Sequence, residues 1–359
     1  MGLNVELMRR LCETPGIPGR EERVRALIQD EVKGLFDSVE ADALGNLICR
    51  RSPRGANGVK VKGAKGEPKR VMLAAHMDEI GFYVRHIDDN GFIWLNPAGG
   101  FDTRNLFSRR VLVCTPNGDR VGVMNPGGRP IHISGDEERK KVPEVKEFFV
   151  DLGIPAAKVK KEVRIGDMVV MHEPLEEVGE KLVSKALDNR FACWLGIEAV
   201  RAIDKAKAAH AMEIVVAFTV QEEVGLRGAR TAAVAVRPDI GVGLDVSLAC
   251  DTPGVPREES VTVQGGGVGL HVMDSSFISD HALLEEVEQI AKKKRIKHQR
   301  TILARGGQDG AALQQAMTGA RAIGLVVGTR YIHTVTEMID KRDLQSAVDL
   351  LAAWLPTLK

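Results

Sequence analysis

The feature that most constrains the fold of this chain is a change of pattern between residues 82 and 176. There, short segments of alternating apolar and polar residues are separated by turn signals such as Asp89-Asn-Gly91 and Pro116-Asn-Gly118, which is typical of β-rich structure. Longer apolar and helical segments lie on both sides. The 359 residues therefore predict one larger domain formed by residues 1–81 and 177–359, into which a β-rich domain, residues 82–176, is inserted.

The two flanking segments have the pattern of an α/β protein. Uninterrupted apolar runs suit strands that are buried on both faces of a sheet. Apolar segments predict strands over residues 47–50, 71–75, 212–220, 240–244, 260–264 and 322–328. Apolar residues at helical spacing predict two helices within residues 3–34 and further helices over 191–203, 276–294 and 342–355. Strands that alternate with helices indicate an α/β fold with a mixed, largely parallel central sheet sandwiched by helices.

The composition excludes several classes of protein. Lys and Arg number 50 and Asp and Glu 49, which gives a net charge of +1, whereas nucleic-acid and membrane-surface binding usually accompany a strong basic excess. No apolar run approaches the ~18 residues of a transmembrane helix, and the first residues lack the regions of a secretion signal. The five cysteines are scattered without a CxxC pair, so disulfides are not expected. We expect a cytoplasmic protein with no nucleic-acid or membrane partner.

Most polar residues of chemical interest directly follow predicted strands. Because sites in open α/β sheets form outside the carboxyl ends of the strands, we expect these side chains to converge. They are His76 and Asp78, Glu222 and Glu223, Asp245, and His333, joined by Asp188 at the start of a helix. Imidazole and carboxylate groups together suit divalent metals. Since no cysteine is among them, a catalytic site with open coordination positions is favoured over a closed structural zinc site.

Most of these residues also have a purely structural interpretation. Asp188 can be a helix N-cap, Asp245 a turn residue and His333 a surface histidine. The Glu222–Glu223 pair can lie in a solvated loop. Two adjacent carboxylates at a buried strand end are costly unless they are neutralised, however, which favours a metal or a shared proton.

His76 can likewise be a hydrogen-bonded structural residue. In the extended segment His76-Met-Asp78, the first and third side chains point to the same side. Asp78 can then hold the second imidazole nitrogen, which is the usual support of a metal-bound histidine. The spacing thus favours a ligand role for His76 with Asp78 behind it.

Seven short motifs in fixed order give the chain a resemblance to a known family. They resemble those of the tetrahedral aminopeptidases, co-catalytic metallo-aminopeptidases that are also labelled glutamyl or deblocking aminopeptidases, and some of which are labelled endoglucanases. The resemblance covers nearly the whole chain. The motifs are His76–Gly81, Ala186–Arg190, Gln221–Gly225, Gly243–Val246, Asp251–Gly254, Gly306–Asp309 and Arg330–Thr334.

The resemblance implies a two-metal site that hydrolyses the N-terminal residue from peptides. Its implied ligands are His76 and Asp245 for one ion, Glu223 and His333 for the other, and Asp188 as the bridge between them. Glu222 is implied as the general base and Asp78 as the residue that orients His76. Zinc or cobalt is the expected metal, with manganese and nickel as further options. The resemblance also implies that the inserted domain drives assembly, from dimers, into a hollow tetrahedral dodecamer.

The sequence departs from the family pattern in two places. The basic loop of residues 52–69, expected to be exposed, is longer than usual, and Gly306-Gly-Gln-Asp309 stands where Gly-Gly-Thr-Asp is usual. The second departure borders the expected site and therefore bears on substrate preference. Asp309 can alternatively cap a helix over residues 310–317.

Two other functions can be weighed against a peptidase. A glycoside hydrolase needs two carboxylates across a sugar cleft and no metal, and only 3 Trp and 2 Tyr are available for sugar stacking. A non-catalytic, peptide-binding shell of the same fold would be expected to have lost ligands, whereas every implied ligand is present. The basic run Lys292–Lys297 ends a predicted helix, where cations are favoured by the helix dipole.

Overall fold

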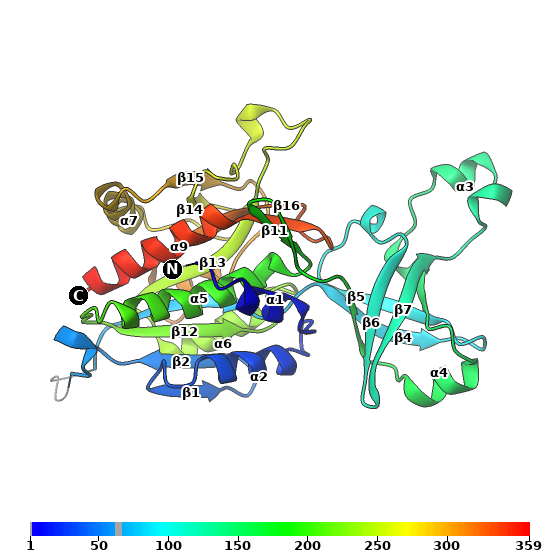
Figure 1. Ribbon diagram of the computed structural model, residues 1–359, viewed down its shortest axis with the longest axis horizontal. Coiled ribbons are helices and arrows are strands. Elements are labelled where there is room, and N and C mark those ends of the chain that lie inside the picture. The colour runs from blue at the N-terminus through cyan, green and yellow to red at the C-terminus, as the bar shows by residue number, and fades with distance from the viewer. Residues whose placement is uncertain (1, 62–66) are drawn as a thin grey trace.

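The computed structural model describes residues 2–61 and 67–359. Two bodies lie side by side along the long axis of the molecule (Figure 1). Within the described residues, the larger body contains an 11-stranded sheet flanked by helices, and the smaller body is a closed barrel of six strands. The expected fold class is confirmed. The domain boundaries at residues 81/82 and 176/177 stay a prediction.

The sheet of the larger body is parallel at its centre. The central strands are β12 (Glu213–Thr219), β3 (Arg70–His76), β13 (Ile240–Leu248) and β16 (Arg321–Arg330). They are extended by β2 (Leu47–Arg51) and β1 (Ser38–Ala41) on one side and by β17 (Glu337–Asp340), β11 (Lys181–Ser184) and β10 (Glu176–Val178) on the other. The sheet also includes β14 (Val268–Met273), beside β16, and β15 (His298–Ile302). The carboxyl ends of the parallel strands therefore meet at one edge.

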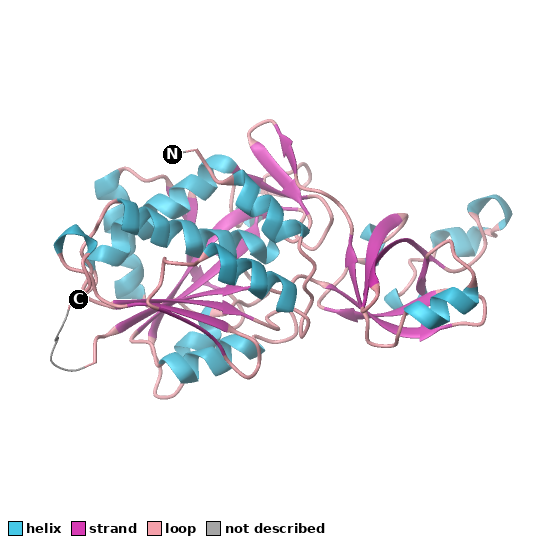
Figure 2. Ribbon diagram, turned by 60° about the horizontal axis from the view of Figure 1, so that its bottom comes forward, coloured by secondary structure: helices cyan, strands magenta, loops and turns pink. Residues whose placement is uncertain are grey.

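Helices cover both faces of this sheet (Figure 2). One face is covered by α5 (Leu187–Lys205), which packs against α1 (Val5–Glu13) and α9 (Lys341–Trp354). The same core includes residues of α2 (Glu22–Glu31) and α7 (His281–Lys294). The opposite face is covered by α6 (Arg227–Val236) and α8 (Gly310–Gln314).

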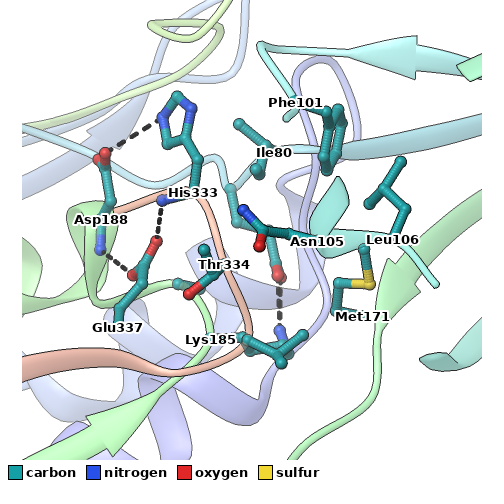
Figure 3. A pocket seen from close by; sticks show the side chains of 13 residues that line it. Ile80, Phe101, Asn105, Leu106, Met171, Lys185, Asp188, His333, Thr334 and Glu337 are labelled. Atoms are coloured by element: carbon teal, nitrogen blue, oxygen red, sulfur yellow. Dashed lines mark hydrogen bonds and ion pairs between the residues drawn. The ribbon is translucent and has the colours of Figure 1, made fainter. Parts of the chain in front are cut away.

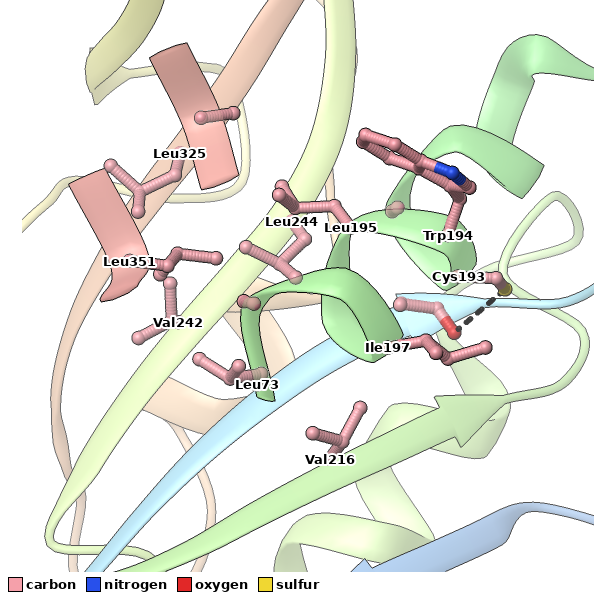
Figure 4. Packing of buried hydrophobic residues seen from close by; sticks show 14 of the residues in the cluster. Leu73, Cys193, Trp194, Leu195, Ile197, Val216, Val242, Leu244, Leu325 and Leu351 are labelled. Atoms are coloured by element: carbon pink, nitrogen blue, oxygen red, sulfur yellow. Dashed lines mark hydrogen bonds between the residues drawn. The ribbon is translucent and has the colours of Figure 1, made fainter. Parts of the chain in front are cut away.

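Strand β3 shows why its apolar run is uninterrupted. Leu73 belongs to the core beneath α5, together with Val216 and Leu195 (Figure 4). Its neighbours Met72 and Ala74 belong to the separate core beneath α6 and α8. Because successive side chains of a strand point to opposite faces, a strand covered on both sides needs apolar residues at every position.

The barrel has a hydrophobic core of its own. Its strands are β4 (Gly81–Ile87), β5 (Ile93–Ala98), β6 (Arg109–Thr115), β7 (Gly118–Pro126), β8 (Phe148–Asp151) and β9 (Met168–Met171), with α4 (Ala156–Glu162) alongside. Phe82 lies in this core, and its ring stacks on that of Phe101 at a centroid distance of 4.4 Å. The first and last strands, β4 and β9, pair with each other. The chain therefore enters and leaves the barrel at neighbouring points.

A long excursion projects from the barrel between β7 and β8. It spans residues 127–147 and contains the short helix α3 (Asp136–Lys140), at the far right of Figure 1. None of its residues is buried. Ile131, Ile133 and Val142 are 66%, 68% and 56% exposed, so this segment carries apolar side chains that the single chain does not cover.

The prediction of a strand at residues 260–264 is wrong. Its alternating residues have the right pattern, but strand pairing is limited to one bridge, between Thr262 and Ala249, and side chains accept the next two backbone amides. The amide of Val263 donates to Oε1 of Gln299 at 3.0 Å, and that of Gln264 donates to Oδ2 of Asp251 at 3.0 Å. The strand forms later, as β14.

The other predicted elements differ from the observed ones mainly at their ends, whereas α6, β1, β11 and β15 were not predicted. The helix expected from residue 276 begins at His281, because Oδ1 of Asp280 accepts the amide of Leu283 at 2.8 Å and caps it. The basic loop contains a short turn at Ala56–Gly58 and is mostly exposed where it is described, and its residues 62–66 lie outside the described residues. Among the helices of the described ranges, none is long and apolar enough to cross a membrane.

Candidate active site

The parallel centre of the sheet places the predicted site residues at one edge. His76 ends β3 and is in register with Thr219, which ends β12, so the loop that carries Glu222 and Glu223 starts beside it. Asp245 lies within β13, and Asp188 is the second residue of α5. His333 follows the end of β16 by three residues. The six predicted residues named here line one cavity of about 900 Å³.

Asp188 lies between the two histidines. Its Oδ1 is 3.3 Å from Nε2 of His76, and its Oδ2 is 3.3 Å from Nε2 of His333. Burial acts to raise the pKa of Asp188, but the two imidazoles hold this pKa well below its usual range. One carboxylate therefore connects the two sides of the site.

The remaining carboxylates divide between the two histidines. Oε1 of Glu223 is 3.3 Å from Nε2 of His333, and Oε2 of Glu222 is 3.8 Å from Nε2 of His76. Asp245 and Glu222 each offer an oxygen within 4.8 Å of a ring nitrogen of His76, and Asp188 and Glu223 form a second such group with the same histidine. The donors thus form two overlapping sets of metal-binding type.

The charges of the cluster indicate what it can hold. Burial raises the pKa of Glu222, Glu223 and Asp245, and neighbouring carboxylates raise it further. Two histidines face this excess of negative charge. Buried carboxylates are stable in such numbers only when cations or protons neutralise them. Imidazole and carboxylate donors around open space fit divalent cations.

Asp78 supports the site in a way that differs in detail from the expectation. Nδ1 of His76 lies 3.0 Å from the backbone carbonyl oxygen of Asp78 and 3.6 Å from its carboxylate Oδ1. The carboxylate instead accepts the amides of Glu222 and Glu223, each at 3.1 Å. One residue therefore contacts His76 and also fixes the backbone of the neighbouring loop.

Glu337 is a site residue that sequence reasoning did not single out. Its Oε2 accepts the amide of Asp188 at 2.9 Å, and its Oε1 accepts the amide of His333 at 2.8 Å (Figure 3). It is buried at the start of β17. Its only sequence signal is a charged residue that opens a short strand four positions after His333.

The segment that departs from the family pattern lies in the cavity wall. Gln308 lines the cavity and is buried against Gly243, whose position would bring a Cβ within 2.2 Å of its Oε1. Asp309 precedes α8 but makes no side-chain cap; its carboxylate accepts a hydrogen bond from the hydroxyl of Thr219. Asp309 thus occupies the N-cap position of α8, as the alternative interpretation expected, but it does so through its backbone carbonyl and not through its side chain.

The barrel contributes one wall of the cavity. The loop between β5 and β6 brings Gly100, Phe101 and Asp102 to the lining. A Cβ at Gly100 would lie 3.8 Å from Nδ1 of His333. The predicted site is thus enclosed by both bodies.

Comparisons with known proteins give consistent matches over most or nearly all of the chain. The family model described as M42 glutamyl aminopeptidase matches residues 55–350. A lysyl aminopeptidase of Pyrococcus furiosus is 31% identical, with 99% of this chain and 97% of the relative covered. The solved aminopeptidase structure from Desulfurococcus kamchatkensis is 32% identical, with 98% and 94% covered and a TM-score of 0.90. The TET1 peptidase of Pyrococcus horikoshii, whose structure is described as assembling into a tetrahedron or a large octahedral shell, is 29% identical, with 98% of each chain covered and a TM-score of 0.84.

An α/β body with an inserted barrel, together with these matches, defines a peptide hydrolase. The chain belongs to the M42 glutamyl aminopeptidase family.

Proposed function

We propose that this protein is a two-metal aminopeptidase that removes the N-terminal residue from peptides. The observation that carries the proposal is the position of the Asp188 carboxylate, 3.3 Å from Nε2 of His76 on one side and 3.3 Å from Nε2 of His333 on the other. A carboxylate between two imidazoles is a suitable bridge between two cations. The names of relatives such as the lysyl aminopeptidase support the reaction class.

The ligands divide into two sets around Asp188. His76 and Asp245 would hold one ion, and His333 and Glu223 would hold the other. The 3.3 Å distance between Nε2 of His333 and Oε1 of Glu223 supports the second set. His76 and Asp245 belong to one donor group, which also contains Glu222, and the assignment of Glu222 as base within that group follows the family resemblance. Zinc or cobalt suits these borderline donors best, with manganese or nickel also compatible.

The chain's own residues supply the proton transfer. When bound, the two divalent cations lower the pKa of a coordinated water and polarise the scissile carbonyl. Glu222 lies beside His76 but outside the proposed ligand sets, so its carboxylate can accept the proton of the attacking water and pass it to the leaving amine.

We also propose a homo-oligomer, most simply a dodecamer built from dimers. Support comes from the exposed apolar residues Ile131, Ile133 and Val142 on the barrel excursion and from the assembly of the Pyrococcus horikoshii relative. The five cysteines are free thiols, which fits the proposed cytoplasmic location.

An assay of metal-loaded and chelated protein tests the reaction. Aminoacyl p-nitroanilides, their N-acetylated forms and cellulose are offered to the same preparation. We expect p-nitroaniline to be released from the free aminoacyl substrates alone. Activity should be lost after chelation and should return when zinc, cobalt or manganese is added. Full activity after complete metal removal, or cleavage of cellulose alone, would contradict the proposal. A folded, metal-loaded protein without activity on any substrate would favour the non-catalytic shell.

A further inference from the structure

Three successive backbone amides at the end of β12 are held by two buried carboxylates. The amide of Gln221 donates to Oε1 of Glu21 at 3.1 Å. The amides of Glu222 and Glu223 donate to Oδ1 and Oδ2 of Asp78, each at 3.1 Å. The loop that carries the proposed general base is therefore fixed to two segments far away in the sequence.

The conformation of Gln221 explains why this loop needs an anchor. Its φ is +55°, in the left-handed region that non-glycine residues avoid. A residue keeps such a conformation only when its surroundings impose it. The hydrogen bond from Gln221 to Glu21 acts at this point, immediately before Glu222.

Glu21 is poorly suited to the ordinary role of its position. It stands at the N-cap of α2, yet its side chain makes no capping hydrogen bond. Its Oε1 accepts the amides of Gly19, at 2.7 Å, and of Gln221, and the residue is 3% exposed. Burial and the negative charge of Asp78 raise the pKa of Glu21 to about 7. The buried carboxyl group of Glu21 therefore binds the loop that carries Glu222 and does not cap α2.

We propose that Glu21 is a positioning residue, which holds the backbone of Gln221 so that the carboxylate of Glu222 faces the attacking water. The inference rests on the proposed function. Glu21 acts through the backbone, and it does not itself line the cavity. A displaced base lowers the rate of the chemical step, since efficient proton transfer needs the base within hydrogen-bond reach.

The test exploits the fact that both contacts use the same oxygen. In Glu21→Gln the amide oxygen can accept both hydrogen bonds, whereas Glu21→Met keeps the length of the side chain but has no oxygen acceptor. We expect Glu21→Met to lower kcat by about 10–100-fold with KM within about twofold of wild type and the wild-type metal content. Glu21→Gln should stay within about threefold of wild type. The control is Glu22→Met, at the next position along the chain, which removes an exposed ion-pair partner of Arg20. It should leave kcat, KM and metal content at their wild-type values.

The outcomes separate this inference from the proposed function. Wild-type protein that is inactive with metals bound contradicts the proposed function. Active wild type with an equally active Glu21→Met overturns the positioning role, as does a loss of activity explained entirely by lost metal. If Glu21→Met fails to assemble, Glu21→Gln decides, because a drop of more than about tenfold in this variant contradicts a role carried by the hydrogen bonds.

Discussion

Glu337 joins the backbone of Asp188 to that of His333, with one carboxylate oxygen on each amide. Asp188 and His333 face each other across the site. Both are therefore positioned by a third residue, Glu337, which binds their backbone amides. Burial and the charge of Asp188 raise the pKa of Glu337. Each of the two amides thus has its own acceptor, and both acceptors belong to one carboxylate.

Replacing Glu337 with Gln should weaken metal binding. The amide nitrogen cannot accept a hydrogen bond, so one of the two anchored amides loses its partner. Supporting residues of metal sites typically contribute 10–100-fold to metal affinity, and we expect a loss in this range, measured by competition with a chelator. The exposed Glu176→Gln in β10 is the control. An unchanged affinity in Glu337→Gln would show that the amides do not set the site.

Replacing Asp188 with Ala should remove both metals, because the proposed bridge serves both ions. Replacing His76 or His333 should mainly weaken one of them. Elemental analysis of purified protein gives the number of ions per subunit directly. Two ions still bound to the Asp188→Ala variant would be incompatible with a bridging role.

The neighbours Glu222 and Glu223 should respond differently to the same change. Glu222→Gln should keep both metals and lose about 10²–10⁴-fold in turnover, which is the usual contribution of a positioned acid–base group. Glu223→Gln should weaken one metal, since an amide oxygen is a poorer ligand, and its activity should partly return at high metal concentration. Metal titrations of both variants decide, and the reverse result would exchange the two assignments.

The ion pair of Asp251 with Arg330 should make stability depend on pH. Nε and Nη2 of Arg330 lie 2.7 and 2.8 Å from the two carboxylate oxygens, and these hydrogen bonds lower the pKa of Asp251. A group with a lowered folded-state pKa stabilises the fold above its unfolded pKa of about 3.9 and ceases to do so as the pH falls through the folded value. Asp251→Asn should therefore lower the melting temperature by roughly 1–3 °C at pH 7.

The same variant should differ less from wild type as the medium becomes acidic. Calorimetry of both proteins between pH 7 and pH 3 measures the difference. A gap in melting temperature that stays constant over this range would show that the charge of Asp251 does not contribute.

Charges placed on the barrel excursion should disrupt assembly. Ile131→Glu and Ile133→Glu put carboxylates where we propose apolar contact between subunits, and desolvating a charge is unfavourable. Light scattering should show smaller particles, with the barrel still folded because neither side chain belongs to its core. Val59→Glu, at a residue that is 66% exposed on the larger body, serves as the control. Full-size particles in both excursion variants would exclude this surface.

Elements were predictable from the sequence where apolar pattern and packing agree. The run that became β3 is apolar at every position because both faces are covered, and the parallel arrangement then brings His76 and Asp245 together. The error at residues 260–264 has another origin. There the local pattern is that of a strand, but Asp251 and Gln299 bind the amides, and these partners are distant in sequence.

The supporting residues of the site were missed for the same reason. Glu21 and Glu337 act on backbone amides 200 and 149 residues away, and neither lies in a motif with ligand spacing. The division of the ligands between two ions came from the resemblance to a family, since spacing alone does not assign a carboxylate to one ion or to the other.

Because β4 pairs with β9, the two points at which the barrel joins the larger body lie side by side. Exchange of such a unit between related enzymes would leave the path of the chain through the larger body unchanged. The exchange would carry the Gly100–Asp102 loop along, and with it a section of the cleft. Replacing the barrel, which we propose to carry contacts between subunits, would therefore change one wall of the cavity as well.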